Sequence, residues 1–567
     1  MLHKELDVEE SKRFFHHSHG PMKGDPDGFG LLPDGSRVQS VKDTRVDKYS
    51  VPNKGLHDEN VYNLIKNELR LDGNPVLNLA SFVNTFTDDF AQRLIDENLN
   101  KNLADNDEYP QLIHMNERCI AMLARLWQAD TTRDKPLGCA TTGSSEAIML
   151  GGLAMKRQWE KKMKAAQKPI TKPNIVMSSA CQVALEKFAR YFDVECRLVP
   201  VDTEYGYHLN PNKLWDYVNE NTIGIFVILG TTYTGHLENV EEVGKVLDQI
   251  EAQNPEWSNK NIPIHVDGAS GGFIVPFAFT ESQMAKYGLG RWGFNHPRVV
   301  SINTSGHKFG LTTPGLGWIV WKNDEYLLPE LRFKLKYLGG IEETFNLNFS
   351  RPGFQVIHQY YNFLTLGKQG YYEKFNQSIF VARSFAWKLL RDPDLKDIFE
   401  VVSCLHEKMN SSTIANSIDD YWESPHQFKP GIPLCAFKLS EKFKAEHPEI
   451  PQSIISTLLR QKGWIIPNYP LPQSTDGSDK KEVLRVVFRI EMKLDMCLLL
   501  VQDIFAIIEK LIKSYEYLNI HSTNNNHAVF KILSTLSNAD MDAVIQDLSE
   551  IEIEKQKHVK KNYRGTC

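Results

Sequence analysis

The first stretch whose side chains could do chemistry is "SGHKFG", which holds His307 and Lys308. It directly follows the apolar alternation "VVSIN", so Lys308 stands at the end of a short buried strand. An amine in that position is placed more like a nucleophile than like a solvated surface charge. The alternative is a loop lysine paired with a carboxylate, and only the surrounding motifs can decide between the two.

The second stretch is "IPIHVDGASGGF", an apolar run that ends in Asp267 and continues into small residues. A carboxylate at a strand end can hold a proton on a heteroaromatic nitrogen, because its charge stabilises the resulting cation. A helix cap or a structural ion pair would use the same residue. Asp267 precedes Lys308 by one further strand unit, which favours the chemical interpretation.

The third stretch is "CATTGSSEAIMLGGLAMK", where Ser144 and Ser145 precede a helical run. Free N–H groups and the positive dipole end at a helix N-terminus attract anions, so hydroxyls and amides together could cradle a phosphate. An ordinary N-cap followed by Glu146 is the alternative.

Taken in chain order, the three stretches supply an anion cradle, a carboxylate and an amine. Pyridoxal phosphate needs this set, because a lysine forms the aldimine, a carboxylate keeps the ring nitrogen protonated, and the ring accepts electrons from the substrate. We therefore predict pyridoxal 5'-phosphate as the cofactor, and no metal.

The elements that must position these residues form an alternation of strands and helices. Helical spacing occurs in "ERCIAMLARLWQA" and "NVEEVGKVLDQIEAQ". Short β-branched runs occur in "NIVMSSA", "CRLVPV", "IGIFVILG", "IPIHVDG", "VVSINTS" and "GWIVW". Near-continuous apolar strands with intervening helices favour an α/β fold with a mostly parallel sheet, whose ligand residues gather at strand ends.

Composition changes along the chain predict its domain organisation. We expect a flexible N-terminal arm (1–60), an N-terminal segment (61–105), a large cofactor-binding domain (106–375), a smaller C-terminal α/β domain (376–518) and a C-terminal tail (519–567). The small domain should contain the strands "PLCAFKLS" and "EVLRVVFRI".

Composition and charge narrow the class of protein. The 567 residues are 41% hydrophobic and 24% charged with a net charge of −6, so neither nucleic acid nor an anionic membrane is an expected partner. Eight cysteines without a C-x-x-C pair disfavour a zinc site and a disulfide framework. With neither a secretory h-region nor a membrane-spanning run, a cytoplasmic protein is predicted.

Longer motifs extend these interpretations. "TTGSSEA", "CQVALEKFARYFDVE", "TTYTGHLE", "HVDGASGGF", "SGHKFGLTTPGLGW", "YLGG" and "NFSRPGFQVIHQYY" closely resemble, in order, the bacterial, plant and fungal glutamate decarboxylases, which are group II pyridoxal-phosphate decarboxylases of fold type I. The resemblance covers about residues 60–515 and is closest to the fungal enzymes, including the terminal "NYRGTC". It implies decarboxylation of L-glutamate to 4-aminobutanoate and carbon dioxide, with roles in 4-aminobutanoate metabolism or stress tolerance.

The resemblance also implies roles around the cofactor. Lys308 would form the internal aldimine and Asp267 would pair with the ring nitrogen. The remaining implied cofactor residues are Ser144, Ser145 and His307 at the phosphate, Thr232 and Ala269 near the ring, Gln182 against the ring face, and Ser350 from a neighbouring subunit.

Substrate contacts are implied in the same way. The matching positions are Ser81, Phe82, Asn102 and Asp105 for the distal carboxylate and Arg485 for the α-carboxylate. Asn102 and Asp105 would also suit a turn. Tyr337, in the lid-like "FKLKYLGGIEETF", is a candidate for protonating the substrate carbon after carbon dioxide leaves, and His307 is the competing donor. Segment 61–105 is expected to contribute to the dimer and to the substrate site.

Two alternatives stay open at this level. One is a pyridoxal-phosphate lyase acting on another amino acid or on a sphingoid phosphate, and the other is a binding or regulatory protein that has lost catalysis. A homo-oligomer is expected, at least a dimer because Ser350 would cross between subunits, and possibly a hexamer. Calmodulin is not an expected partner, because "EKQKHVKKNYRGTC" lacks the bulky apolar anchors of a calmodulin target.

Overall fold

The computed structural model describes residues 49–53, 55–130, 132–335, 342–448, 450–473 and 481–521. The chain divides into two units, Met1–Asp72 and Gly73–Cys567. In the first unit, the described part contains helix α2 (Asp58–Leu69), which carries none of its residues buried. Most of the predicted arm and nearly all of the predicted tail lie outside the described residues.

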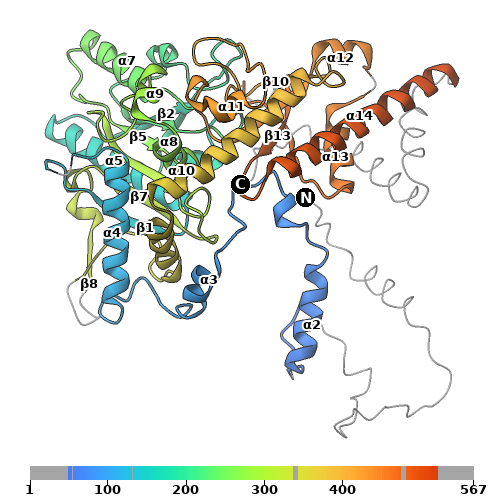
Figure 1. Ribbon diagram of the computed structural model, residues 1–567. Helices are drawn as coiled ribbons and strands as arrows, with labels where there is room; N and C mark the ends of the chain where they lie inside the picture. Colours follow the sequence, from blue (N-terminus) through green and yellow to red (C-terminus); the bar gives the residue numbers. More distant parts are fainter. Residues whose placement is uncertain are drawn as a thin grey trace, which may run out of the picture. The chain divides into compact units, whose positions relative to one another are not determined.

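A seven-stranded sheet forms the centre of the second unit (Figure 1). Its order is β1-β7-β6-β5-β4-β2-β3, and the five strands β3, β2, β4, β5 and β6 are parallel, whereas β7 runs antiparallel to both of its neighbours. The strands are β1 (Leu137–Thr141), β2 (Asn174–Ser178), β3 (Glu195–Val199), β4 (Thr222–Ile228), β5 (Ile264–Asp267), β6 (Val299–Ser305) and β7 (Gly317–Trp321). The six predicted strands and the mostly parallel α/β fold are confirmed, and β1 was not predicted.

Helices cover both faces of this sheet, as the alternation of its side chains requires. On β2 and β4, Ile175 and Phe226 pack with α5 and α6, whereas Val176 and Val227 belong to the core that includes α7 and α8. The covering helices are α4 (Pro110–Leu126), α5 (Ser144–Ala165), α6 (Val183–Tyr191), α7 (Val240–Gln253) and α8 (Gly271–Ala278). Two further helices of this part are α3 (Asp89–Asp96), which packs on α10 (Phe354–Arg391), and α9 (Glu281–Lys286). Because both faces are buried, the strands read as continuous apolar runs rather than as alternating ones.

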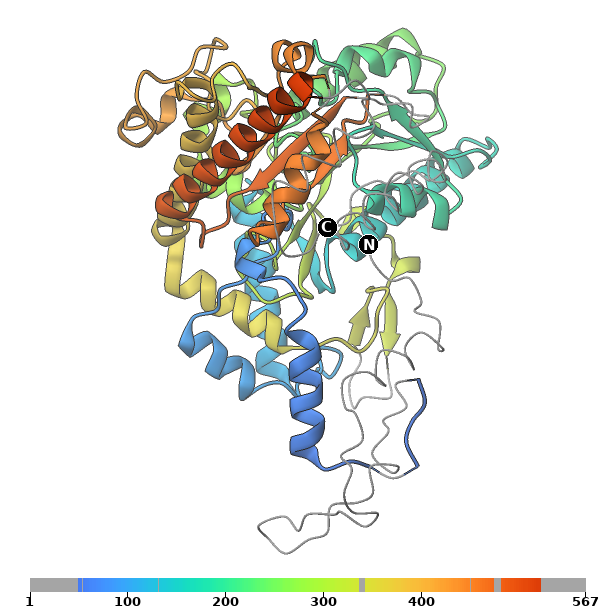
Figure 2. The ribbon, with the colours of Figure 1, turned by 90° about the vertical axis from the view of Figure 1, so that its right-hand side faces the viewer.

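A smaller antiparallel sheet, in the order β10-β11-β13-β12, forms the C-terminal α/β part (Figure 2). Its elements are β10 (Phe399–Val401), β11 (Leu434–Leu439), β12 (Asn468–Pro470), β13 (Glu482–Val487), α11 (Asp420–Glu423), α12 (Glu441–Glu446), α13 (Gln452–Gln461) and α14 (Leu494–His521). Both strands predicted here are confirmed as β11 and β13. The short edge strands β10 and β12 were not predicted.

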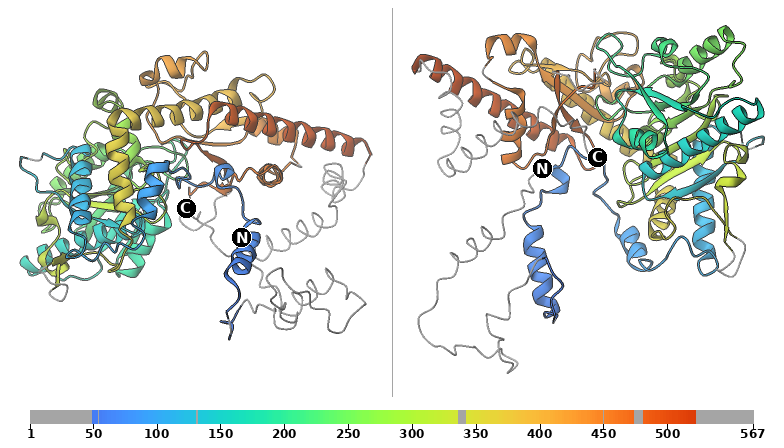
Figure 3. Two further views of the ribbon diagram at one scale, coloured as in Figure 1. Left: turned by 60° about the horizontal axis from the view of Figure 1, so that its bottom comes forward. Right: turned by 180° about the vertical axis from the view of Figure 1, so that it is seen from behind.

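Helix α10 (Phe354–Arg391) joins the two parts, because it packs on α3, α4 and α8 of the first part and on β10, β11 and α14 of the second (Figure 3). A non-helical residue, Gly367 with φ of 55°, divides the two halves. The predicted boundary at 375/376 falls inside this helix. The remaining short elements are the hairpin β8 (Phe333–Leu335) and β9 (Glu342–Thr344) and the 3-10 turns η2 (Pro75–Leu77), η3 (Pro211–Asp216), η4 (Asp324–Tyr326), η5 (Pro329–Leu331) and η6 (Pro425–Gln427).

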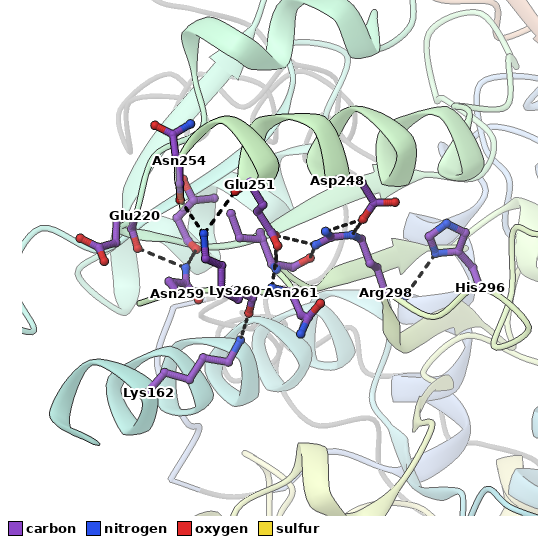
Figure 4. Close-up of polar contacts among 12 residues, drawn as sticks. Lys162, Glu220, Asp248, Glu251, Asn254, Asn259, Lys260, Asn261, His296 and Arg298 are labelled. Carbon is purple, nitrogen blue, oxygen red and sulfur yellow. Dashed lines mark hydrogen bonds and ion pairs between the residues drawn. The ribbon is translucent and has the colours of Figure 1, made fainter. Parts of the chain in front are cut away.

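A polar network fixes the amino ends of the central strands (Figure 4). Arg298, one residue before β6, donates to Asp248 at 2.6 Å and to Glu251 at 2.7 Å. Asn259 donates to the backbone carbonyls of Glu220 and Thr222, so it ties the loop before β5 to the start of β4. This edge is structural, and the carboxyl ends of the strands remain for the site.

Candidate active site

The carboxyl ends of β4, β5 and β6 meet at a cavity of about 240 Å³. Side chains predicted from separate motifs converge on it. The predicted residues that line it are Phe82, Ser144, Ser145, Gln182, Thr232, Asp267, Ala269, His307 and Lys308. Because parallel strands bring their carboxyl ends to one edge, residues 164 positions apart, Ser144 and Lys308, reach the same space.

Lys308 is buried without a carboxylate partner. The residue is 6% exposed, and its ammonium forms no ion pair with a described side chain. The ammonium lies over the Phe82 ring, whose centroid is 5.2 Å from Nζ. A lysine is almost never buried unless it is paired, so this amine is held for chemistry rather than for stability.

Asp267 ends β5 beside Lys308 and is 4% exposed. Its Oδ1 accepts the backbone N–H of Ala269 and the side-chain N–H of Asn303, both at 3.0 Å. Within the described part of the chain no donor reaches Oδ2. The carboxylate therefore lines the cavity with one oxygen fixed and the other available to a cationic ligand.

The first turn of α5 lies at the same cavity, and no described side chain caps it. The Ser144 hydroxyl lies 2.6 Å from the hydroxyl of Ser305 at the end of β6, which fixes the helix N-terminus against the sheet. Gly317 permits this approach, because a Cβ there would lie 2.4 Å from the Gly143 carbonyl carbon. Uncapped amides beside two serine hydroxyls suit a phosphate group.

His307 is a neutral imidazole with a defined tautomer. Burial, reinforced by the charge of Lys308, lowers the pKa of His307 to about 4. Its Nδ1 accepts the backbone N–H of Leu316 at 3.2 Å, so the single proton of the neutral ring is on Nε2. The ring can donate one hydrogen bond from Nε2.

The other cofactor candidates lie in loops after the strands. Gln182 is the N-cap of α6, and its side chain accepts from the Ala184 amide. Thr232 follows β4, and its carbonyl accepts from the Arg485 guanidinium at 3.0 Å. Ala269 accepts the Ser305 amide through its carbonyl, which connects the ends of β5 and β6.

The substrate candidates fall into two groups. Arg485 packs over Phe82 with its guanidinium carbon 5.0 Å from the ring centroid, and its buried Nε lacks a hydrogen-bond partner among the described residues. Ser81 precedes Phe82 and accepts the Val83 amide. These three residues lie at the Lys308 cavity or directly beside it.

Asn102, Asp105 and Ser350 form the second group and do not line that cavity. Asn102 donates to the Ser350 hydroxyl at 3.4 Å, and its carbonyl accepts the Asp105 amide in a turn. Their sequence neighbours, including Leu103 and Arg351, line a second and larger cavity of about 670 Å³. Tyr337 lies outside the described residues.

Sequence reasoning missed two residues behind the cavity, His265 and Asn303. Both are fully buried, and both contribute to one hydrogen-bonded chain that reaches Asp267. A signal was present, because polar residues recur at every second position in "IHVD" and "SIN" within otherwise apolar strands. Such a repeat places them on one face of the sheet, in line with the cavity.

A mostly parallel sheet with a buried, unpaired lysine after one strand and an aspartate ending the next strand defines a type I pyridoxal-phosphate-dependent enzyme. The family model for the pyridoxal-dependent decarboxylase conserved domain matches residues 53–410. The chain belongs to this family.

Individual relatives agree with that membership. The chain is 63% identical to the glutamate decarboxylase of Saccharomyces cerevisiae over 532 residues, which are 92% of this chain and 90% of that protein. It is 39% identical to the glutamate decarboxylase of Petunia hybrida, covering 82% of this chain and 84% of that one.

Solved structures give the same picture of the fold. The glutamate decarboxylase of Lactobacillus brevis superposes with a TM-score of 0.71 at 34% identity, covering 84% of this chain and 97% of that one. The tryptophan decarboxylase of Catharanthus roseus reaches a TM-score of 0.62 at 15% identity over 81% of this chain and 89% of that one, a likeness of fold alone.

Proposed function

We propose that this chain is a glutamate decarboxylase, which converts L-glutamate to 4-aminobutanoate and carbon dioxide with pyridoxal 5'-phosphate. The observation that carries the proposal is the unpaired, buried Lys308 beside Asp267 in a chain 63% identical to a glutamate decarboxylase. Pyridoxal phosphate, when bound, supplies the electron sink that accepts the electron pair released with carbon dioxide.

The residues of the cavity have distinct tasks in this proposal. Lys308 would hold the cofactor covalently through Nζ. Asp267 would hold a proton at the ring nitrogen through Oδ2, since its Oδ1 already accepts two hydrogen bonds. Ser144 and Ser145, with the first amides of α5 and the Nε2–H of His307, bind the phosphate.

Three further cofactor contacts complete the arrangement. Gln182 would lie against the ring face, and Thr232 and Ala269 would border the ring. They come from the ends of β2, β4 and β5, so the sheet edge itself shapes a flat slot. Ser350 of a neighbouring subunit adds to the phosphate side.

Arg485 binds the α-carboxylate of glutamate. Its guanidinium is buried, its two terminal nitrogens already donate to backbone carbonyls, and its Nε–H is left to a ligand. Ser81, Phe82, Asn102 and Asp105 hold the distal carboxylate.

Proton transfer to the substrate α-carbon ends the reaction. Tyr337 is the first candidate donor, and His307 is the second, because its neutral ring carries a proton on Nε2. One proton is consumed in each turnover, so carbon dioxide release removes acid from the solution.

The active unit is a homo-oligomer of at least two subunits, possibly six. Support comes from the separation of the two groups of candidates, because Asn102, Asp105 and Ser350 do not reach the Lys308 cavity of their own chain. Their sequence neighbours line the larger cavity between α4 and β9, and a second copy packed there would bring the three residues to its own site.

The enzyme is cytoplasmic in this proposal, and it acts in 4-aminobutanoate metabolism or stress tolerance. Among the described residues no helix combines the length and the apolar character needed to cross a bilayer.

We also propose the domain organisation that the sequence predicts, with boundaries after residues 60, 105, 375 and 518.

A substrate panel tests the proposal. Purified holoenzyme should release carbon dioxide from glutamate and much less from aspartate or aromatic amino acids. Activity on another amino acid but not on glutamate would refute the substrate. The Lys308→Ala variant should lose both the cofactor's visible absorbance and the activity, and retained activity would refute the mechanism.

The same measurements separate an enzyme from a regulator that has lost catalysis. A folded chain that binds pyridoxal phosphate but releases no carbon dioxide from any amino acid would favour the regulator. The intact set of Lys308, Asp267 and Gln182 argues for the enzyme.

A further inference from the structure

A chain of four buried polar side chains runs along the sheet to the cavity. Ser301 lies 2.7 Å from His265 Nδ1, His265 Nε2 lies 2.7 Å from the Asn303 side-chain oxygen, and Asn303 Nδ2 donates to Asp267 Oδ1 at 3.0 Å. Only Asp267, at the end of the chain, borders the cavity. The other three residues have no direct access to a ligand there.

Strand register brings these side chains together. In the parallel pair β5 and β6, His265 is opposite Ser301 and Asp267 is opposite Asn303. Residues two apart on a strand share a face, so all four side chains lie on the face that α5 covers. Helix α5 crosses them closely, because a Cβ on Gly151 would lie 2.6 Å from the His265 ring.

Each hydrogen bond among these four side chains can have only one donor direction. A carboxylate only accepts, so Asn303 must present its NH₂ to Asp267 and its oxygen to His265. That oxygen also only accepts, so His265 must carry its proton on Nε2. Burial lowers the pKa of His265 to about 4, so Nδ1 is bare and accepts from the Ser301 hydroxyl.

We propose that Asn303 and His265 are positioning residues for the reaction, which fix the orientation of the Asp267 carboxylate so that Oδ2 meets the protonated ring nitrogen of the cofactor. His265 acts through Asn303, because its Nε2–H determines which end of the Asn303 amide faces Asp267. A flipped amide would aim an oxygen at the carboxylate and repel it.

The inference rests on the cofactor chemistry of the proposed function, and it makes a claim about two residues that contact neither cofactor nor substrate. Hydrogen bonds to a charged group are the strong ones, and the pairing of Asp267 with the ring is used both in binding the cofactor and in the transition state. Loss of the Asn303 donor should therefore weaken cofactor binding and lower kcat, with little effect on KM for glutamate.

The experiment compares two buried asparagines in the full chain. Asn303→Ala should raise the Kd of the apoenzyme for pyridoxal phosphate, measured without amino acid, and lower kcat at saturating cofactor, each by roughly 10- to 100-fold. Asn259→Ala is the matched control, because Asn259 is as buried and donates two hydrogen bonds at the opposite edge of the sheet (Figure 4). It should lower thermal stability while Kd and kcat stay within about 2-fold.

A second pair of variants tests the role of His265. His265→Phe removes the Nε2–H donor, and His265→Gln restores an N–H near the same position. The first should raise the cofactor Kd, and the second should recover most of the loss. If Asn303→Ala does not fold, Asn303→Asp keeps the shape of the side chain and replaces the donor by an acceptor, which should weaken cofactor binding at least as much.

Two results would overturn the inference. One is an Asn303→Ala or Asn303→Asp enzyme with the unaltered Kd and kcat. The other is an Asn259→Ala control that loses cofactor affinity to the same extent. Failure of the proposed function gives a different result. The unaltered protein would then release no carbon dioxide from glutamate, but the variants would still differ from it in their Kd for pyridoxal phosphate.

Discussion

The Lys308 ammonium lies 5.2 Å from the centroid of the Phe82 ring, and the Arg485 guanidinium lies 5.0 Å from the same centroid. An aromatic face attracts cations, so one ring stabilises two charges that would otherwise only repel each other. Phe82 thus connects the proposed anchor of the cofactor to the proposed anchor of the substrate's α-carboxylate.

We expect Phe82→Leu to impair substrate binding more than cofactor binding. Loss of the ring frees the Arg485 side chain, and a cation–π contact of about 0.5–2 kcal/mol corresponds to a rise in KM for glutamate of roughly 2- to 30-fold. Steady-state kinetics measures this rise. Phe309→Leu is the control, because Phe309 packs edge-on to Phe82, with ring centroids 6.3 Å apart, and contacts neither cation in that way. An equal rise in KM for both variants would contradict the role of the ring.

Glu146 provides a second prediction, on α5. Its Oε1 accepts the backbone amides of Leu347 and Asn348, and its Oε2 accepts the amide and hydroxyl of Thr142. Glu146→Gln would turn an NH₂ group toward these donors. We expect a loss of about 2–3 kcal/mol in the free energy of unfolding, measured by urea titration, because buried donors lose their acceptor. The segment leading to Ser350 should loosen with it.

The control for this change lies on the same helix. Glu160 is also buried, but its main partner is the half-exposed Arg157, so Glu160→Gln should cost less than about 1 kcal/mol. Equal costs for the two substitutions would show that Glu146 does not hold the 347–348 segment.

Arg298 provides a third prediction, at the amino edge of the sheet (Figure 4). Burial alone would raise the pKa of Glu251, but the hydrogen bond from Arg298 and two backbone amides bring it below its usual value. Arg298→Met leaves that carboxylate buried without its cation, and should lower the free energy of unfolding by about 3–5 kcal/mol. Once folded and saturated with cofactor, the variant should keep its kcat, since the network is at the edge opposite the cavity.

A double-mutant cycle checks this assignment. Arg298→Met combined with Glu251→Gln should cost less than the sum of the single changes, by about 0.5–3 kcal/mol. Arg93→Met, which breaks an exposed pair with Glu97, should cost under about 1 kcal/mol. Additive costs in the cycle would show that the two buried charges do not interact.

Much of the fold could be predicted from the sequence, because its central strands are buried on both faces and therefore read as unbroken apolar runs. Strand β1 was missed because "LGCAT" is short and holds little β-branched character. Strands β10 and β12, of three residues each, carry too few side chains for a period-2 pattern.

The candidate site was predicted in part, and for different reasons at different residues. Lys308 and Asp267 stand at strand ends, where sequence spacing and chemistry coincide. His265 and Asn303 act inside strands, and their importance depends on the register between β5 and β6, which the sequence of either strand does not specify. The separation of Asn102 from the Lys308 cavity likewise depends on how distant segments pack.

A fourth prediction concerns the dependence of stability on pH. Burial lowers the pKa of five histidines to about 4 and of a sixth to about 3; the five are His208, His265, His296, His307 and His358, and the sixth is His406. Each stays neutral in the folded chain but takes up a proton near pH 6.5 when unfolded. Their contribution is complete above about pH 6.5 and declines as the pH falls toward 4.

The contribution of one buried carboxylate to stability changes with pH in the opposite direction. Burial raises the pKa of Glu238 to about 7, so its contribution declines as the pH rises from 4.5 through 7. Six histidines outweigh one carboxylate, and the thermal midpoint of the apoenzyme should therefore fall between pH 6.5 and 4.

His296→Asn tests this assignment at a position remote from the cavity. The His296 Nδ1 accepts the backbone amide of Arg298 at 3.2 Å, and an asparagine oxygen can accept from the amide two residues on in the same way. Asparagine does not titrate, so the variant should lose less stability than the unaltered chain between pH 6.5 and 4. The difference should reach about 1.4 kcal/mol for each pH unit by which burial lowers the pKa of His296. Urea titrations at three pH values across this window measure the slope. An unchanged slope would mean that His296 takes up its proton equally in the folded and unfolded chains, so that burial does not hold it neutral.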